Sequence, residues 1–332
     1  MKLAQLSLCL LLGLLTSCSS VRLLTFDQLT PAQVSYPVQV KNIAVVNNMP
    51  PVPEAKRNVV TLGDIGADGK ISAEALATAL ADSKYFNQVM ICDSVLYSSE
   101  QEAKGVYTLP MSSVDQLLAD LDADMLFSYD RLFIQAQKEK VYYPDMPVGW
   151  DVVKVKIAPL VSLYVAHKDK PVQVVSKSDS LFFEIDPRLD DSEIRKEAAL
   201  VAAGLLAKHF TPYWASAERF YFDGGNSYMR DAGVCVREND WEGAQKIWEK
   251  LFNRSKSDKV KVRTAFNLAL ACEMTGDFDG ANRWMEEAKK HLNPNSQDKT
   301  TVDVYAVQLS KRIAEMPYLN MQMSRFNNNF QE

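Results

Sequence analysis

The chain has 332 residues, of which 47% are hydrophobic, 24% charged and 10% aromatic, and its formal net charge is −5. This composition excludes a disordered protein, a collagen-like fibre and a small disulfide scaffold, and the length suits about two domains, each with its own core. The acidic balance also excludes the basic surface typical of nucleic-acid binding, so no nucleic-acid partner is expected.

The N-terminus has the pattern of an export signal. Met1-Lys2 gives a positive start, and Leu3–Leu15 is an apolar run shorter than the ~20 residues of a membrane-spanning helix. The next residues, Leu15-Thr16-Ser17-Cys18, resemble the lipobox of bacterial lipoproteins. The resemblance implies that residues 1–17 are a signal peptide and that acyl chains on Cys18 bind the protein to a membrane. The alternative is a buried apolar helix with a chance cysteine.

The residue after Cys18 bears on the destination. Lipoproteins of this kind that stay in the inner membrane typically carry Asp at that position, whereas this chain has Ser19. The resemblance therefore implies a lipid anchor in the outer membrane, with the protein on the periplasmic face.

After a predicted tether over residues 18–37, which contains Pro31 and Pro37, residues 38–222 are expected to form an α+β domain with a mixed sheet. Alternating and continuous apolar runs predict the strands, and the 3.6-residue period predicts the helices. Ser72 is the expected N-cap of the first helix. The expected strands are Val38–Val46, Phe86–Cys92, Met125–Ile134, Val152–Val165 and Val172–Ile185, and the expected helices are Ser72–Ala81, Val114–Leu121 and Asp191–His209.

Three segments of this domain carry a further resemblance. The strand IAVV, the helix end ADSKYFNQV and the helix-to-strand passage LADLDADML are similar to the small α+β domain of curli-secretion and penicillin-binding-protein-activator lipoproteins. The shared features are hydrophobic pattern and not chemistry, so the resemblance implies a fold and no function.

Residues 226–313 contain an internal repeat. Asp240-Trp241-Glu242-Gly243-Ala244 recurs 37 residues later as Asp277-Phe278-Asp279-Gly280-Ala281, and the second copy resembles a tetratricopeptide repeat. The resemblance implies an all-α module of paired helices. Two copies are few for a continuous core, so a capping helix is expected at Thr300–Ile313. Residues 314–332 are expected to be a flexible tail.

Two surfaces are candidates for binding a protein or peptide partner. In tetratricopeptide repeats the first helix of each pair lines a concave groove, and the resemblance places six residues there: Met229, Arg237, Arg263, Phe266, Leu270 and Met274. The alternative is that the first domain or the final helix fills this groove. The second surface is the aromatic loop with Tyr142, Tyr143 and Trp150, which forms a binding tip unless it folds back onto the sheet.

The motifs that suggest catalysis or metal binding have simpler interpretations. The segment Asp64–Ile71 resembles the start of an EF-hand loop, but it lacks the final bidentate carboxylate and is typical of an Asp-Gly turn before a helix. Asp120, Asp122 and Asp124 fit a solvated corner, and Cys235 and Cys272 fit core positions. No catalytic signature, cofactor motif or metal-ligand spacing occurs in the sequence.

These patterns predict a lipid-anchored periplasmic protein-binding or scaffold protein that is not an enzyme. Two alternatives stay open: a lipoprotein that binds a glycan or a peptide, and an enzyme with an unrecognised carboxylate site.

Overall fold

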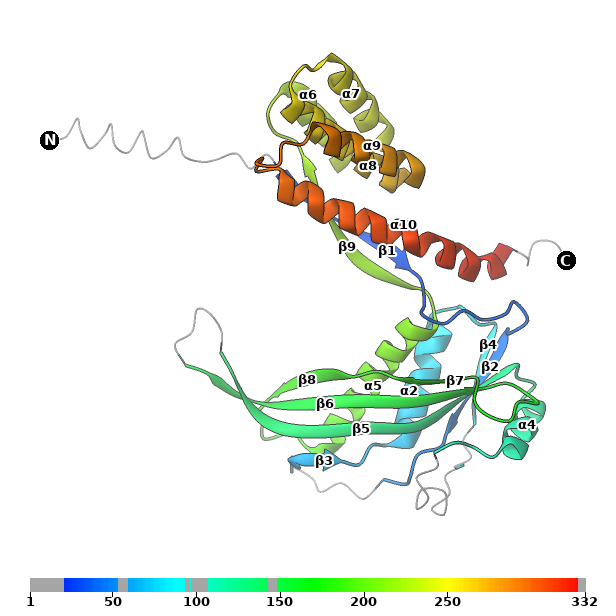
Figure 1. Ribbon diagram of the computed structural model, residues 1–332. Helices are drawn as coiled ribbons and strands as arrows, with labels where there is room; N and C mark the ends of the chain where they lie inside the picture. Colours follow the sequence, from blue (N-terminus) through cyan, green and yellow to red (C-terminus); the bar gives the residue numbers. More distant parts are fainter. Residues whose placement is uncertain (1–20, 53–58, 93–95, 97–106, 143–147, 328–332) are drawn as a thin grey trace. The chain divides into compact units, whose positions relative to one another are not determined.

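The computed structural model describes residues 21–52, 59–92, 96, 107–142 and 148–327, whose elements are labelled in Figure 1. The expected signal peptide (residues 1–17) and Cys18 lie outside the described residues. The chain forms two compact units. Unit 1 combines the N-terminal segment up to Thr30 with Trp214–Asn320, and unit 2 combines Pro31–Tyr213 with the residues from Met321 onward. No helix among the described residues is long and apolar enough to span a membrane.

Unit 2 is built on a mixed sheet with the strand order β4-β2-β5-β6-β7, in which β3 also pairs with β5 and β8 with β6. The β4, β2 and β5 strands are parallel, and β5 and β6 form a long antiparallel pair. The α+β expectation is confirmed. The strands are β2 (Asn42–Asn47), β3 (Gly63–Ile65), β4 (Gln88–Cys92), β5 (Met125–Val141), β6 (Trp150–Tyr164), β7 (Gln173–Ser176) and β8 (Asp179–Glu184).

Helices cover one face of this sheet along much of its length. Helix α2 (Gly69–Asp82) and helix α5 (Asp191–Phe210) contribute to the same hydrophobic core as Phe127, Ile134 and Val155 of the sheet. Figure 1 shows the two helices on the same side of β5 and β6. On the opposite face, helix α4 (Met111–Asp120) packs in a smaller core with Ala44, Leu126 and Tyr164.

Several boundaries differ from the expectation. Helix α2 begins three residues earlier than predicted, because Asp68 and not Ser72 is the N-cap and accepts a hydrogen bond of 3.0 Å from the Ile71 N–H. This arrangement is the Asp-Gly turn before a helix. The expected strand Val172–Ile185 is two strands, β7 and β8, that pair with successive parts of β6.

Unit 1 starts with a strand where a tether was expected. Strand β1 (Val21–Thr30) pairs with β9 (Tyr213–Phe222), the strand that follows α5 in the sequence. The prediction of a tether over residues 18–37 is therefore wrong for Val21–Thr30. The short alternation in β1 does not by itself predict a strand, because its pairing partner lies almost 200 residues away and no local pattern indicates the pairing.

The rest of unit 1 is helical: α6 (Ser227–Arg237), α7 (Trp241–Arg254), α8 (Asp258–Thr275), α9 (Phe278–His291) and α10 (Lys299–Asn327). The repeated sequence explains how the helix pairs turn. Asp240 and Asp277 are N-caps whose carboxylates each accept a 2.8 Å hydrogen bond, from the N–H of Gly243 and of Gly280. The side-chain carboxylate of each Asp lies where a Cβ at the glycine would be, so a larger residue there would require the carboxylate to shift.

The C-terminal segment is helical and not a flexible tail, as far as it is described. Helix α10 runs to Asn327, and its last residues, from Met321, belong to unit 2. There the buried Gln322 amide accepts from the Ala32 N–H at 2.9 Å and donates to the carbonyl oxygens of Ala32 and Val34. Arg325 lies over the Tyr85 ring, 4.3 Å from its centroid. The Gln322 hydrogen bonds anchor the helix end because they satisfy backbone groups that would otherwise be buried without partners.

We expect Gln322→Ala to destabilise unit 2 by about 2 kcal/mol or more, because it leaves buried backbone donors and acceptors unpaired. Chemical denaturation of the whole chain measures the change. Asn320→Ala is the matched control, since Asn320 is exposed on the same helix. Equal stability of the two variants would show that the Gln322 hydrogen bonds do not hold the helix end.

Candidate functional site

The predicted groove of the helical module is not open in the structure. Met229, Phe266 and Leu270 are 2%, 0% and 0% exposed, so they belong to the core of unit 1. Tyr305 of α10 covers this region, with its ring centroid 4.9 Å from that of Phe266. The final helix therefore fills the place where a partner was predicted, which was the alternative considered above.

The other three predicted groove residues lie in different environments. Arg263 makes a bidentate ion pair with the buried carboxylate of Asp298, at 2.7 and 2.8 Å, and its guanidinium lies over Phe222. Met274 is half-buried against the core, and Arg237 is exposed. Arg263 thus has a structural role that its sequence position did not indicate.

The aromatic loop is described only at its ends. Tyr142 is 69% and Trp150 57% exposed, whereas Tyr143 lies outside the described residues. The described ends are therefore accessible, and Trp150 belongs to strand β6.

Trp150 lies at one end of a larger surface, which we call the open face. It is the sheet face opposite α2 and α5, and no described helix covers it at the hairpin end of β5 and β6. Residues that pair across neighbouring strands form rows on this face. One row is Gln137, Lys154 and Phe182, the next is Gln135, Lys156 and Ser180, and in a third Ala158 lies beside Phe133. The open face comprises Phe133, Gln135, Gln137, Glu139, Trp150, Lys154, Lys156, Ala158, Ser180, Phe182 and Glu184, with Asp64 of β3 at its edge.

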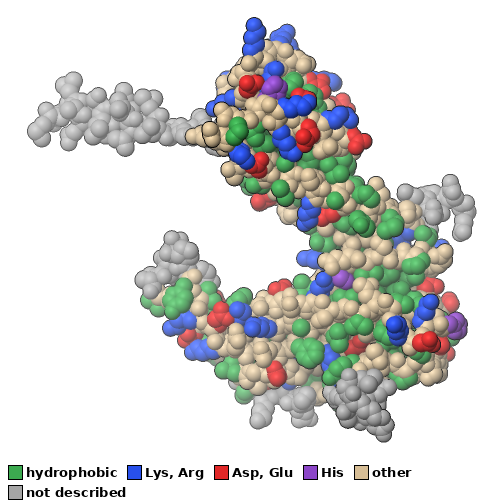
Figure 2. Space-filling model, in the orientation of Figure 1, with side chains coloured by type: hydrophobic (Ala, Val, Ile, Leu, Met, Phe, Trp, Pro, Cys, Tyr) green, Lys and Arg blue, Asp and Glu red, His purple; other side chains and the backbone are tan. Residues whose placement is uncertain are grey.

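Three large aromatic side chains protrude from the open face. Phe133 and Phe182 are 58% and 55% exposed, close to the value of Trp150. Lys154 bridges the middle of this surface, because its ammonium group lies 5.4 Å from the Phe182 ring centroid and 2.9 Å from the Glu139 carboxylate. Figure 2 shows hydrophobic and charged side chains side by side at the hairpin end of β5 and β6.

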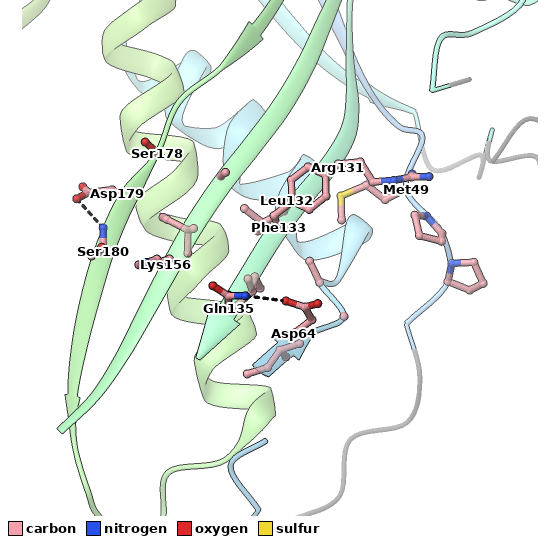
Figure 3. A pocket seen from close by; sticks show the side chains of 18 residues that line it. Met49, Asp64, Arg131, Leu132, Phe133, Gln135, Lys156, Ser178, Asp179 and Ser180 are labelled. Carbon is pink, nitrogen blue, oxygen red and sulfur yellow. Dashed lines mark hydrogen bonds between the residues drawn. The ribbon is translucent and has the colours of Figure 1, made fainter. Parts of the chain in front are cut away.

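A cleft of about 940 Å³ opens at the Phe133 end of the open face. Met49, Pro50 and Leu132 contribute to its largely apolar lining, which also contains polar side chains from β3, β5, β6 and β8. Figure 3 shows Phe133 and Lys156 in this cleft, with the Gln135 amide donating to the Asp64 carboxylate at 3.4 Å. The cleft offers an aromatic surface together with donors and acceptors of both charges, which suits a ligand with apolar and polar groups.

A buried polar cluster lies beside the cleft. The carboxylate of Asp130, which is 1% exposed, accepts hydrogen bonds from Asn48 Nδ2 at 2.9 Å, Ser128 Oγ at 2.6 Å and Ser162 Oγ at 2.5 Å. Burial raises the pKa of the Asp130 carboxyl, although these hydrogen bonds and the charge of Arg131 oppose that shift. Because three side chains donate hydrogen bonds to this buried carboxylate, the cluster contributes to the structure of the fold.

Of the three aspartates at the predicted solvated corner, Asp124 has backbone partners. Asp124 accepts hydrogen bonds of 2.8 Å from the N–H groups of Lys41 and Asn42, so it caps the start of β2. Within the described part of the chain, no group of three or more His, Cys, Asp or Glu side chains could hold a metal ion. Cys92, Cys235 and Cys272 are free thiols.

Sequence reasoning missed Phe133, Phe182 and the cleft. The alternation of apolar residues along the predicted strand Val152–Val165 puts Lys154 and Lys156 on its polar face. The neighbours of that face come from β5 and β8, however, and their register cannot be inferred from one strand alone.

We expect Arg263→Ala to destabilise unit 1 by about 3–5 kcal/mol, because it leaves the Asp298 carboxylate buried without its partner. Arg237→Ala, at an exposed position, should change stability by less than about 0.5 kcal/mol. Urea denaturation of the two variants is the measurement. A similar, small effect at both positions would contradict the structural role of Arg263.

The Asp130 carboxyl makes stability depend on pH. Because its pKa is raised in the folded state above the ordinary 3.8, the folded chain binds a proton that the unfolded chain has already released. The free energy of unfolding that this bound proton contributes is therefore lost as the pH rises from 3.8 through the raised pKa. We expect Asp130→Asn to gain stability relative to the wild type over that rise, measured by urea denaturation at several pH values. Asp120→Asn, at an exposed carboxylate, should show no such gain, and equal behaviour of both variants would contradict the raised pKa.

Comparisons with solved structures give distant likenesses. The PelC dodecamer from Paraburkholderia phytofirmans is 11% identical, with a TM-score of 0.26, and the match covers 57% of this chain and 98% of that one. A minor lipoprotein from Acinetobacter baumannii is 5% identical, with a TM-score of 0.25, over 51% of this chain and 87% of that one. At such TM-scores neither likeness supports an inference about this chain. No curated protein matches it.

Two family models match the sequence. A domain of unknown function, DUF6340, matches residues 230–311, within the helical part of unit 1. Another domain of unknown function, DUF8603, matches residues 40–222, which is more than half of the chain and includes the sheet of unit 2. The chain belongs to the DUF8603 family.

Proposed function

We propose that this protein is a lipid-anchored scaffold protein of the bacterial cell envelope that binds partner proteins and has no catalytic activity. Acyl chains on Cys18 anchor it in the outer membrane, with the folded chain on the periplasmic face. The α+β unit belongs to the type found in curli-secretion and penicillin-binding-protein-activator lipoproteins, and the helix pairs α6/α7 and α8/α9 form a tetratricopeptide-like module.

The observation that carries the binding function is the open face with its cleft. Exposed aromatic side chains contribute most of the binding energy at many protein interfaces, and here Phe133, Phe182 and Trp150 protrude from one surface. Covering one sheet face with helices while the other exposes large apolar side chains is typical of a surface that binds another molecule. This surface replaces the groove of the helical module as the partner site.

A glycan ligand is the alternative that the cleft also suits. An aromatic ring beside Gln135, Lys156 and Asp64 can bind a hydroxyl-rich ligand as well as a polypeptide. We favour a protein partner because the three aromatic side chains extend from the cleft to the hairpin end of the sheet, well beyond the size of one small ligand.

Affinity capture from chemically crosslinked native envelopes tests the proposal. The tagged wild-type chain should retain a discrete partner, and Phe133→Ser combined with Phe182→Ser should reduce its recovery at least tenfold. Trp214→Ser is the matched control, because Trp214 is 69% exposed on β9 of unit 1. Retention of the same partner by the double variant would overturn the site.

A second part of this experiment tests the lipid anchor. The wild-type chain should incorporate radiolabelled palmitate and fractionate with outer membranes, and Cys18→Ser should abolish both. Incorporation that persists in Cys18→Ser would contradict the proposed lipid attachment. Recovery of a glycan in place of a protein from the wild-type capture would favour the alternative ligand.

A further inference from the structure

The open face of unit 2 carries side chains in matching positions on either side of one central row. Its residues are arranged about the row that contains Gln137, Lys154 and Phe182. Trp150 precedes Lys154 by four residues on β6, and Ala158 follows it by four, with Phe133 beside Ala158. Four residues of strand span about 13 Å, so a protruding indole and a cleft lie at similar distances on either side of this central row.

The charged side chains follow the same arrangement. Between the central row and Trp150 lie two carboxylates, Glu139 and Glu184, which flank Val152. Between the central row and the cleft lies the ammonium group of Lys156, flanked by Gln135 and Ser180, with Asp64 of β3 beyond Gln135. The acidic row and the lysine row are thus equally far from the centre, on opposite sides.

We propose that two copies of this chain pair through their open faces, with Trp150 of each copy entering the cleft of the other. The two-fold axis runs between the two sheets, parallel to the central row. It reverses the strand direction in the second copy, so each row of one copy lies opposite the row on the other side of the centre in its partner. Trp150 then faces Ala158, whose small side chain leaves room next to Phe133. Glu184 faces Ser180 and comes near Lys156, and the Phe182 rings of the two copies meet at the axis.

One contact across the axis is unfavourable by itself, because Lys154 meets its own copy. Within each chain the Lys154 ammonium group already pairs with the Glu139 carboxylate at 2.9 Å and lies over the Phe182 ring. The pairing therefore brings together two neutral ion pairs and not two bare cations. Asp64 at the cleft edge accepts a hydrogen bond from the Gln135 amide, and Glu139 of the other copy, which would come near it, already pairs with Lys154.

This inference rests on the proposed function, because it names the occupant of the same cleft. Light scattering of the whole lipidated chain in mild detergent measures its mass. We expect twice the mass of one chain at micromolar concentration. Trp150→Ser should weaken the pairing tenfold or more, since the substitution acts twice in a symmetric interface, and Trp214→Ser should not weaken it.

Charge exchange separates pairing from folding. Lys156→Glu and Glu184→Lys should each weaken the dimer about tenfold, and the double variant should restore most of the affinity because it exchanges the two rows. Lys196→Glu, at an exposed position of α5, is the control that should leave the dimer unchanged. Melting temperatures check that every variant folds. A failure of the double variant to restore pairing would overturn the proposed register.

Crosslinking tests the geometry of the axis. Packed sheets lie about 10 Å apart, so Gln137→Cys, in the central row, should join two copies through a bis-maleimide of that length. Lys196→Cys should not. A monomeric wild-type chain that still captures another protein through Phe133 would overturn the self-pairing and leave the proposed function standing. A monomer that captures nothing would overturn both.

Discussion

A β-bulge at Asp130 sets the register on which the open face depends. Strand β5 places Phe127 and Tyr129 toward the α2–α5 core, and after the bulge it places Leu132 and Ile134 there. Without the extra residue, the alternation would direct Arg131 and Phe133 into the core and expose Leu132. The buried hydrogen bonds of Ser128, Ser162 and Asn48 to Asp130 hold this irregularity in place. A polar cluster in the interior thus determines which side chains are available for binding.

The length of the β5–β6 hairpin explains why the open face exists. Strands β5 and β6 pair over their whole length, from Leu126 opposite Tyr164 to Val141 opposite Trp150. Helix α4 covers this face only near Leu126 and Tyr164, while α2 and α5 lie on the other side. A sheet that is longer than the helix on one of its faces leaves apolar side chains in water there, which is tolerated where they bind a partner.

Unit 1 shows how a charged side chain can be misinterpreted from its sequence position. The resemblance to tetratricopeptide repeats predicted that Arg263 and Phe266 line a groove, but here Tyr305 of α10 packs against Phe266. Asp298 binds the guanidinium of Arg263, and nearby the buried Arg219–Glu273 ion pair, with Tyr305 donating to Glu273, closes the core. Such buried ion pairs form only where the fold brings the two charges together, because each charge needs a partner at hydrogen-bond distance to offset its desolvation.

The sequence by itself determined the local elements and the class of the fold. The apolar periods of the strands and helices and the repeated Asp-x-x-Gly caps all depend on residues close together in the chain, where steric and hydrogen-bonding preferences act directly. Only the tertiary structure decided which segments of the chain make up each unit. Strand β1 pairs with a strand almost 200 residues away, and Gln322 satisfies backbone groups near residue 32. The open face was decided in the same way, because a bulge and the register of three strands bring Phe133, Phe182 and Trp150 to one surface, and no single segment carries that information.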